Sequence, residues 1–390
     1  MLSHEDNDFF CRVGPGTPAR QLLRRYWHVV GAAAELNDAK PKKRVRLLGE
    51  NLLLYQDRSG GYGLVAENCS HRGVSLYYGF VEKDGIRCPY HGWKYDACGR
   101  CIDQPFESPE AGFKAKIQHP AYPVEKLAGL LFAYMGPPER KPLLPKWDLL
   151  VRNDGKKQVD ICETLRCNWL QAMENSVDPT HTYYLHSHTL KLKGDPDHVP
   201  YHYRMLNKFD FEFVNYPNWA GIQKQRIFEG DEAPVETPHP LIFPNILFVP
   251  VRIGYAMHFR TPIDDTNTQV YQFRFSPSKD RSAVEQPENT PIAYVGTTDA
   301  AGEFHMDNFT SQDHMAWETQ GPLADRSKEH LGEGDRGIVM FRKLLREQIQ
   351  SVQNGADPIG VNFDPAKDEV IKLIHEEGYD AFSFAAARAS

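Results

Sequence analysis

Two short segments in the first third of the chain each pair a cysteine with a histidine. They are Cys69-Ser70-His71 and Cys88-Pro89-Tyr90-His91, with sixteen residues between them. Two thiolates and two imidazoles suit either a zinc site or a Rieske [2Fe–2S] cluster, in which two histidines replace two cysteines on one iron. In zinc fingers the two cysteines and the two histidines usually form separate pairs. Here each segment supplies one of each, and this layout favours the Rieske cluster.

The residues around these segments refine that interpretation. We expect three nearby glycines to let backbone amides approach the cluster sulfurs and donate hydrogen bonds to them: Gly73, Gly92 and Gly99. Cys98 and Cys101 form a CxxC pair without a second pair, which leaves a redox or zinc role open but favours structural cysteines. The same structural interpretation holds for the remaining cysteines, Cys11, Cys162 and Cys167.

A second segment, residues 168–186, concentrates acidic residues and histidines. Asp178 precedes His181 by three positions, so on a helix its carboxylate can hydrogen-bond the imidazole and orient it toward a metal. His181 and His186 are five apart, which is about 140° on an ideal α-helix, and they cannot meet at one ion unless the helix is distorted. Pro179 supplies a reason for distortion. We therefore expect irregular backbone over residues 176–186.

Two neutral histidines and one carboxylate bind Fe(II) and leave positions open for O2 and substrate. The third ligand must come from elsewhere in the chain, and spacing alone does not choose among the many acids. A solvated helix face is the competing interpretation of this segment.

The elements that must position these residues fall into two classes, which predicts an α+β protein. Residues 1–25 form an N-terminal segment. Residues 26–140 read as a small all-β domain, with a hairpin over 45–55 and a strand over 129–134. Residues 141–390 read as a domain with an antiparallel sheet and packed helices, whose clearest elements are strands at 246–251 and 268–275 and helices at 168–190 (broken at Pro179), 335–352 and 364–375.

Both metal segments together resemble the large subunit of the Rieske non-haem iron aromatic oxygenases, in the phthalate dioxygenase branch. The resemblance runs from about Trp27 to Arg346. Its motifs are Cys69-Ser70-His71-Arg72-Gly73 with Cys88-Pro89-Tyr90-His91-Gly92-Trp93, then Glu174-Asn175 with Asp178, His181 and His186, then Gln312-Asp313 with Glu318 and Gly321-Pro322-Leu323-Ala324-Asp325-Arg326.

This resemblance implies roles for individual residues. Cys69, His71, Cys88 and His91 would hold the cluster, and His181, His186 and Asp313 the mononuclear iron. Asp307 and Glu318 remain alternatives to Asp313. Asn175 and Asp178 would be catalytic residues, with Asp178 as the bridge between the two centres. It also implies a helix-grip (START-like) catalytic domain, and a homotrimer in which His91 contacts Asp178 of a neighbouring copy.

The expected reaction is O2-dependent oxygenation of a small, carboxylated aromatic substrate. Ring dihydroxylation is the first interpretation, and monooxygenation or O-demethylation of a methoxyaryl or aryl-ether acid the second. Since no flavin or nicotinamide motif is evident, electrons would come from a separate NAD(P)H-dependent reductase, which the resemblance implies carries FMN and [2Fe–2S]. A Rieske electron carrier is the competing class, but it would leave residues 141–390 without a role.

Substrate-binding residues are less well defined. Candidate pocket-lining aromatics are Phe243, Phe248, Tyr255, Phe259 and Phe273, and candidate partners for a substrate carboxylate are Arg204, Arg226, Arg252, Arg260 and Arg274. The net charge of −7 over 390 residues gives no reason to expect nucleic acid. No apolar run reaches the length of a membrane span and the N-terminus lacks a signal pattern, which predicts a cytoplasmic protein.

Overall fold

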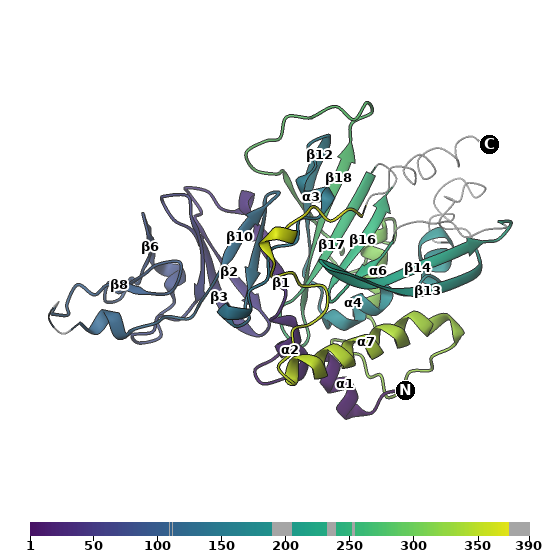
Figure 1. Cartoon of the computed structure of the whole chain (residues 1–390), viewed down its shortest axis with the longest axis horizontal. Helices are drawn as coiled ribbons and strands as arrows, with labels where there is room; N and C mark the ends of the chain where they lie inside the picture. Colours follow the sequence, from purple (N-terminus) through teal and green to yellow (C-terminus); the bar gives the residue numbers. More distant parts are fainter. Residues whose placement is uncertain (109, 111, 189–204, 232–238, 252–253, 374–390) are drawn as a thin grey trace.

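The computed structural model describes residues 1–108, 110, 112–188, 205–231, 239–251 and 254–373. Small β-sheets occupy the first part of the chain, and a large sheet with helices occupies the second (Figure 1). The predicted α+β fold is confirmed. Among the described residues, no helix has both the length and the apolar character that crossing a membrane requires.

Three sheets make up the first part. Their strands, in spatial order, are β1 (Trp27–Ala32), β11 (Leu130–Tyr134) and β10 (Val124–Leu127); β2 (Lys42–Leu47), β3 (Glu50–Gln56), β4 (Tyr62–Ala66) and β9 (Ala121–Tyr122); and β5 (Phe80–Glu82), β6 (Gly85–Arg87), β7 (Lys94–Tyr95) and β8 (Cys101–Asp103). The predicted hairpin is β2–β3. Leu48 and Gly49 turn it with φ of 49° and 80°, the positive values that a tight type I′ turn requires.

One eight-stranded sheet forms the centre of the second part. In spatial order its strands are β13 (Leu206–Tyr216), β14 (Trp219–Phe228), β15 (Leu241–Ile242), β16 (Ile246–Val251), β17 (Gly254–Pro262), β18 (Thr268–Pro277), β12 (Gly155–Cys162) and β19 (Ile292–Val295). All neighbours are antiparallel except β12 and β19. One face of this sheet packs against β1 and β11, joining the two parts through a common apolar core.

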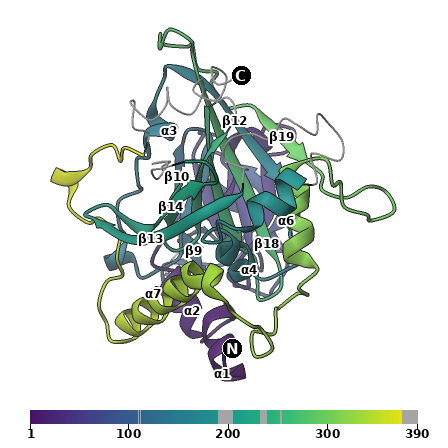
Figure 2. The ribbon, with the colours of Figure 1, turned by 90° about the vertical axis from the view of Figure 1, so that its right-hand side faces the viewer.

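Most helices lie on the other face and at one end of the large sheet, whereas Leu149 and Leu150 of the short helix Asp148–Val151 belong to the core on the β1 side. The helices are α1 (His4–Cys11), α2 (Pro18–Leu23), α3 (Asp148–Val151), α4 (Trp169–Asn175), a π-helix (Thr182–His188), α6 (Phe309–Glu318) and α7 (Arg336–Gln353). Short 3-10 turns lie at Ala33–Glu35, Leu76–Tyr78, Phe113–Lys116, Pro138–Arg140, Glu333–Asp335 and Pro365–Lys367. The predicted helix at 335–352 is confirmed as α7. It buries Phe341, Leu345 and Ile349 along one stripe, and Figure 2 shows it beside α1 and α2.

The helix predicted over 364–375 is wrong for the residues that the structure describes. After the turn at Pro365–Lys367 the chain runs extended, and Ile371 pairs with Trp147 in a parallel bridge. Ile371 and Leu373 are buried whereas Lys372 between them is exposed. Buried and exposed residues thus alternate with the two-residue period of a strand. The segment is too short for this period to be recognised in the sequence. Residues 374–375 lie outside the described residues.

Candidate metal centres

The two Cys/His segments form matching loops, one between β4 and β5 and the other between β6 and β7. In the first loop the Gly73 N–H donates to the Cys69 carbonyl at 2.8 Å. In the second the Gly92 N–H donates to the Cys88 carbonyl at 3.2 Å. Both glycines have positive φ, 73° and 75°, which favours glycine at this point of each turn. The repeat of one turn on two loops places two cysteines and two histidines together.

The amides of these glycines bind backbone carbonyls, whereas the backbone amides of Tyr90 and His91 act on the Cys88 thiol and lower its pKa. The N–H groups of Gly73 and Gly92 bind the cysteine carbonyls, and the Gly99 N–H donates to the Asp96 carbonyl at 2.9 Å. A side chain at Gly99 would lie 2.0 Å from the His119 carbonyl. These glycines therefore shape turns and permit a close backbone approach, and their own amides are not available to cluster sulfurs.

The four candidate ligands fit a Rieske cluster. Cys69 and Cys88 are each 3% exposed, and burial together with the neighbouring Cys69 thiol raises the pKa of Cys88. The rings of His71 and His91 lie 4.6 Å apart. Their Nδ1 atoms are buried and have no hydrogen-bond partner in the described part of the chain. Two adjacent thiols and two unpartnered imidazole nitrogens are what a cluster with cysteines on one iron and histidines on the other requires.

Aromatic residues surround this site, and of these the sequence analysis named only Trp93, as the end of a motif and without a role. Trp93 stacks on His71 with ring centroids 4.4 Å apart and planes 9° apart. The Tyr95 hydroxyl lies 3.1 Å from Cys69 Sγ, and its ring stacks on the buried ring of His119. The spacing of Tyr95 and His119 in the sequence carries no metal motif, so only the folded loops reveal these two residues.

The other cysteines agree with the structural interpretation. All are free, and Cys98 is exposed whereas Cys101 is buried. Burial raises the pKa of three further thiols to about 12, which makes them inert at neutral pH: Cys11, Cys162 and Cys167.

The second site lies where a helix changes type. Helix α4 ends at Asn175, a turn follows, and a π-helix spans Thr182–His188. The predicted irregular backbone at 176–186 is thus confirmed. A π-helix bonds residues five apart, which brings His181 and His186 toward one side. This distortion removes the conflict between their spacing and an ideal α-helix.

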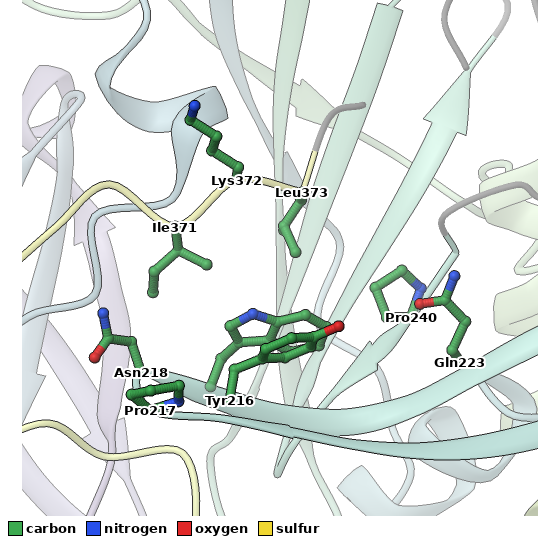
Figure 3. A pocket seen from close by; sticks show the side chains of 9 residues that line it. Tyr216, Pro217, Asn218, Gln223, Pro240, Ile371, Lys372 and Leu373 are labelled. Carbon is green, nitrogen blue, oxygen red and sulfur yellow. The ribbon is translucent and has the colours of Figure 1, made fainter. Parts of the chain in front are cut away.

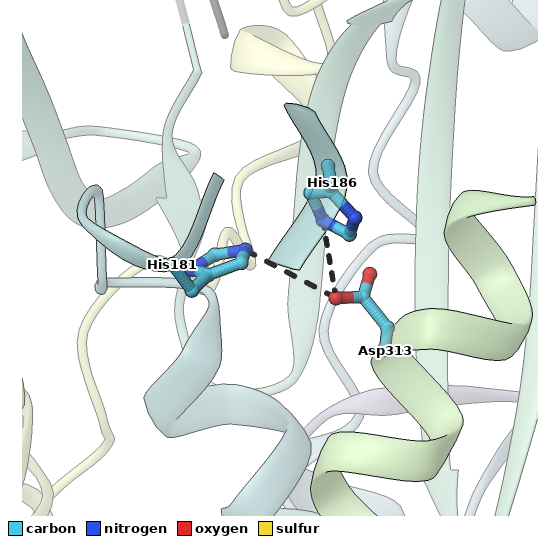
Figure 4. A group of neighbouring side chains, drawn as sticks. All are labelled: His181, His186 and Asp313. Atoms are coloured by element: carbon cyan, nitrogen blue, oxygen red, sulfur yellow. Dashed lines mark ion pairs between the residues drawn. The ribbon is translucent and has the colours of Figure 1, made fainter. Parts of the chain in front are cut away.

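Three side chains converge at this point (Figure 4). Asp313 Oδ1 lies 4.0 Å from His181 Nε2 and 3.4 Å from His186 Nε2. One ligand atom from each of the three residues falls within 4.8 Å of the others. Asp313 comes from α6, so two helices far apart in the sequence supply the set. Asp313 Oδ1 is buried and accepts no hydrogen bond from the described residues, which fits a metal ligand.

Neighbouring groups set the orientation of both imidazoles. Asp178 Oδ2 lies 3.3 Å from His181 Nδ1, so the two side chains are neighbours as predicted, but the described residues give this nitrogen no hydrogen bond. Burial alone would raise the pKa of Asp178, but His181 and Thr180 outweigh burial and lower it to about 2. His186 Nδ1 lies 2.7 Å from Gln312 Oε1. His186 Nδ1 can therefore carry a proton donated to Gln312, which leaves its Nε2 lone pair for a metal.

The three acids that the sequence left open are in different surroundings. Glu318 binds the backbone and side chain of Arg166, and Asp307 is exposed on the loop before α6. Only Asp313 joins the two histidines. Asn175, the last residue of α4, is half-buried, and its carbonyl accepts the Asp178 N–H at 3.0 Å.

The aromatic residues proposed to line a substrate pocket pack in the hydrophobic cores of the protein. Phe243 packs in the core of the helical end of the molecule. The other four lie in the core between the large sheet and β1–β11, on the sheet face opposite α4 and α6: Phe248, Tyr255, Phe259 and Phe273. A strand's side chains alternate between faces, and the sequence alone does not say which face meets the metal.

Two of the candidate arginines already bind other groups of the protein. Arg260 is 1% exposed, donates to the Ala172 carbonyl and the Ser176 hydroxyl, and lies over the Trp317 ring at 4.7 Å. Arg274 is half-exposed and pairs with Asp160 at 2.6 Å. Arg204 and Arg252 lie outside the described residues, and Arg226 is buried on β14.

A hollow of about 260 Å³ at the end of the β13–β14 hairpin is separate from both metal centres. Tyr216 and Trp219 stack on each other there, and Lys372 lies across from them (Figure 3). Gln223 lines this hollow, whereas the next residue of β14, Lys224, reaches the helix side of the sheet. The hollow and the His181–His186–Asp313 site therefore lie on opposite faces of β14.

Comparisons with known proteins agree with this geometry. Residues 26–123 match the Rieske [2Fe-2S] domain family, and residues 295–373 match a family described as "LigXa C-terminal domain like". The chain is 41% identical to the 5,5'-dehydrodivanillate O-demethylase oxygenase subunit of a Sphingobium species, over 97% of this chain and 88% of that protein. It is 35% identical to the phenoxybenzoate dioxygenase subunit alpha of Ectopseudomonas oleovorans, over 93% and 88%. Identity to the phthalate 4,5-dioxygenase oxygenase subunit of Pseudomonas putida is 30%, over 92% and 89%.

Solved structures support the fold. The oxygenase in a complex of carbazole 1,9a-dioxygenase with its ferredoxin superposes with a TM-score of 0.65 at 24% identity, covering 86% of this chain and 93% of that one.

Proposed function

This chain belongs to the Rieske non-haem iron oxygenases, as an oxygenase subunit with a Rieske [2Fe–2S] cluster and a mononuclear iron, and from that premise we propose that it oxygenates an aromatic acid bearing an ether group. The observation that carries the proposal is the pair of sites in one chain, a two-Cys/two-His pair of loops and a two-His/one-carboxylate cluster. A Rieske electron carrier would need only the first.

Each group of residues has a defined part in this proposal. Cys69 and Cys88 hold one iron of the cluster and His71 and His91 the other; the second ligand set is His181, His186 and Asp313. When bound, the cluster supplies electrons one at a time, and the mononuclear iron supplies the open positions for O2. Gln312 keeps His186 in the tautomer that leaves Nε2 toward Asp313, and Asp178 lies 3.3 Å from His181 Nδ1. Asn175 remains a catalytic candidate at the end of α4.

The substrates named for the relatives narrow the range of substrates to propose for this chain. A dehydrodivanillate that undergoes O-demethylation and a phenoxybenzoate are both aromatic carboxylates with an ether oxygen. Removing a methyl group from an aryl ether consumes O2, two electrons and two protons and gives a phenol, formaldehyde and water. Ring dihydroxylation consumes the same reactants and gives a cis-dihydrodiol. The higher identity to the O-demethylase favours the first outcome, whereas our sequence-based first choice was dihydroxylation.

Partners follow from the electron requirement. We propose a separate NAD(P)H-dependent reductase, with FMN and [2Fe–2S], that acts in the cytoplasm on a homotrimer of this chain. A solved relative of the same fold is bound to a ferredoxin, which supports a separate donor protein.

A single turnover without any reductase tests the proposal. The metal-loaded protein is reduced anaerobically, mixed with methoxylated and phenoxylated benzoic acids, and exposed to O2, and products are identified by mass spectrometry. Formaldehyde with a free phenol would establish O-demethylation, and a cis-dihydrodiol would establish dioxygenation. We expect His181→Ala to abolish both products while leaving the cluster's visible spectrum unchanged, because His181 belongs only to the second site. Product formation by this variant would overturn the site assignment.

A further inference from the structure

One fully buried histidine outside both ligand motifs lies against the cluster loops. His119 is 0% exposed and stands two residues before β9. Its backbone N–H donates to the Gly99 carbonyl at 2.8 Å, which fixes its place beside the turn before β8. A buried polar side chain without partners costs about 1–3 kcal/mol, so the groups that satisfy this imidazole show what it holds in place.

The His119 imidazole hydrogen-bonds on both sides to the chain that enters the first ligand loop. Nε2 lies 2.9 Å from the carbonyl of Ala66, the last residue of β4, and Nδ1 lies 2.7 Å from the Ser70 hydroxyl. A carbonyl can only accept, so Nε2 carries the proton. Burial lowers the pKa of His119. The ring is therefore neutral at pH 7, and Nδ1 accepts from the Ser70 O–H. Since Ser70 stands between the ligands Cys69 and His71, these two bonds fix the loop at its entry and at its centre.

The face of the same ring supports a tyrosine from the other ligand loop. Tyr95 belongs to β7, the strand that follows the second loop. Its ring stacks on His119 with centroids 4.4 Å apart and planes 27° apart, and its hydroxyl lies 3.1 Å from Cys69 Sγ. A cysteine that binds a cluster is a thiolate, which can only accept, so the Tyr95 hydroxyl is the donor when the cluster is bound. His119 thus joins the first loop, through Ser70, to the strand after the second, through Tyr95.

A hydrogen bond to a cluster ligand affects how readily the cluster takes up an electron. The donor stabilises negative charge on the thiolate, and the reduced cluster carries more of that charge than the oxidised one. The bond therefore raises the reduction potential. Its strength falls steeply when the distance or the direction of the O–H changes. The group that fixes the Tyr95 ring thereby controls this bond.

We propose that His119 is a positioning residue of the Rieske cluster, which holds the Tyr95 hydroxyl on Cys69 and so raises the reduction potential of the cluster. Its hydrogen bonds and ring contact go to Ala66, Ser70 and Tyr95, so it acts on the cluster through these neighbours. A higher potential makes the cluster easier to reduce by a donor protein. This role rests on the cluster alone and on no property of the substrate proposed above.

Potentiometric titration of the cluster in the metal-loaded full chain, followed by its visible spectrum, tests this role without substrate or reductase. Tyr95→Phe keeps the ring and removes the donor. We expect its preference for the reduced over the oxidised cluster to weaken about tenfold, which is a fall of about 59 mV for one electron. His119→Leu removes the stacked ring and both hydrogen bonds, and it should lower the potential in the same direction.

The double variant shows whether His119 acts through Tyr95. Once the hydroxyl is absent its position no longer matters, so His119→Leu with Tyr95→Phe should have the same potential as Tyr95→Phe alone. A double variant whose shift is the sum of the two single shifts would overturn the inference, as would an unchanged potential in either single variant. If His119→Leu does not retain the cluster, Ser70→Ala takes its place alone and in the double variant, because it removes one of the same hydrogen bonds from the loop side.

Tyr55→Phe is the matched control. Tyr55 is a fully buried tyrosine of the same apolar core, and its hydroxyl lies against Gly63. Its removal should leave the potential unchanged, and a fall equal to that of Tyr95→Phe would show that the bond to Cys69 is not the cause. Any of these failures would leave the oxygenase function standing, because no step of this test involves substrate. A failed single turnover would in turn leave the role of His119 untouched.

Discussion

Gln312 determines which nitrogen of His186 is available to a metal. Its Oε1 accepts from His186 Nδ1 at 2.7 Å, and its own amide donates to the Met306 carbonyl at 3.0 Å, which fixes the orientation of the amide. Gln312→Leu removes the acceptor. We expect it to reduce mononuclear iron affinity or turnover by about 10–100-fold, the usual effect of losing such a partner. Iron content per chain and single-turnover yield measure this.

Two variants separate positioning from packing at Gln312. Gln312→Glu keeps an acceptor for His186 and should retain most iron and activity. Gln320→Leu changes an exposed glutamine just beyond α6, whose side chain binds the Ala316 carbonyl, and should have no effect. Equal losses in the leucine and glutamate variants would show that Gln312 does not act through its acceptor oxygen.

At the scale of elements, one buried carboxylate forms ion pairs that connect α4 with α7 and, through Arg326, with α1. Glu174 on α4 binds Arg326 at 2.7 Å and Arg342 of α7 at 2.7 Å, and Arg326 also reaches Asn7 of α1. Burial alone would raise the pKa of Glu174, but the two arginines outweigh burial and lower it. Since the folded state then binds fewer protons, Glu174 stabilises the fold above the usual glutamate pKa and this contribution is lost as pH falls through the lowered value.

Glu174→Gln should therefore destabilise the protein by about 3–5 kcal/mol at pH 7, because it removes the carboxylate that pairs with buried Arg326 and leaves Arg342 with Glu329 alone. The difference from wild type should shrink at acidic pH, where wild-type Glu174 is itself protonated. Urea unfolding at a series of pH values measures both effects. Glu347→Gln, at an exposed position of α7, is the control and should be neutral. A difference that does not depend on pH would exclude the proposed ion pairs as its cause.

Elements with local patterns were predictable from the sequence, and elements held by distant contacts were not. The β2–β3 hairpin and α7 follow from their own turn and stripe of apolar residues. Helices α1 and α2 were missed because eight and six residues are too few to show a period, and short helices depend on tertiary packing. The Cys/His loops and the His181–His186 pair could be proposed as ligands because their spacing is local, whereas Asp313 was proposed only from the family resemblance. His119 was missed because only folding brings it beside Ser70 and Tyr95.

At the scale of the whole molecule, the two candidate metal centres lie in separate parts of one chain. The cluster loops adjoin β6 at one end of Figure 1, and the His181–His186–Asp313 site adjoins α4 and α6 at the other, with β1 and the large sheet between them. This separation favours electron transfer between copies, with His91 of one chain beside Asp178 of the next. Light scattering should then give the mass of about three 44.5 kDa chains.

Mixing two inactive variants tests transfer between copies directly. His71→Ala lacks a cluster ligand but keeps the second site, and His181→Ala lacks an iron ligand but keeps the cluster. Co-expressed, they should form mixed trimers in which an intact cluster of one copy faces an intact iron site of another. We expect these trimers to recover a substantial fraction of wild-type turnover. At an active interface the His181→Ala chain supplies the cluster ligands and the His71→Ala chain supplies the iron ligands. The two variants purified separately and then mixed are the control and should stay inactive if trimers do not exchange subunits. Absence of recovery in co-expressed trimers that contain both metals would show that electrons move within one chain, and Asp178 could then not be the bridge between neighbours.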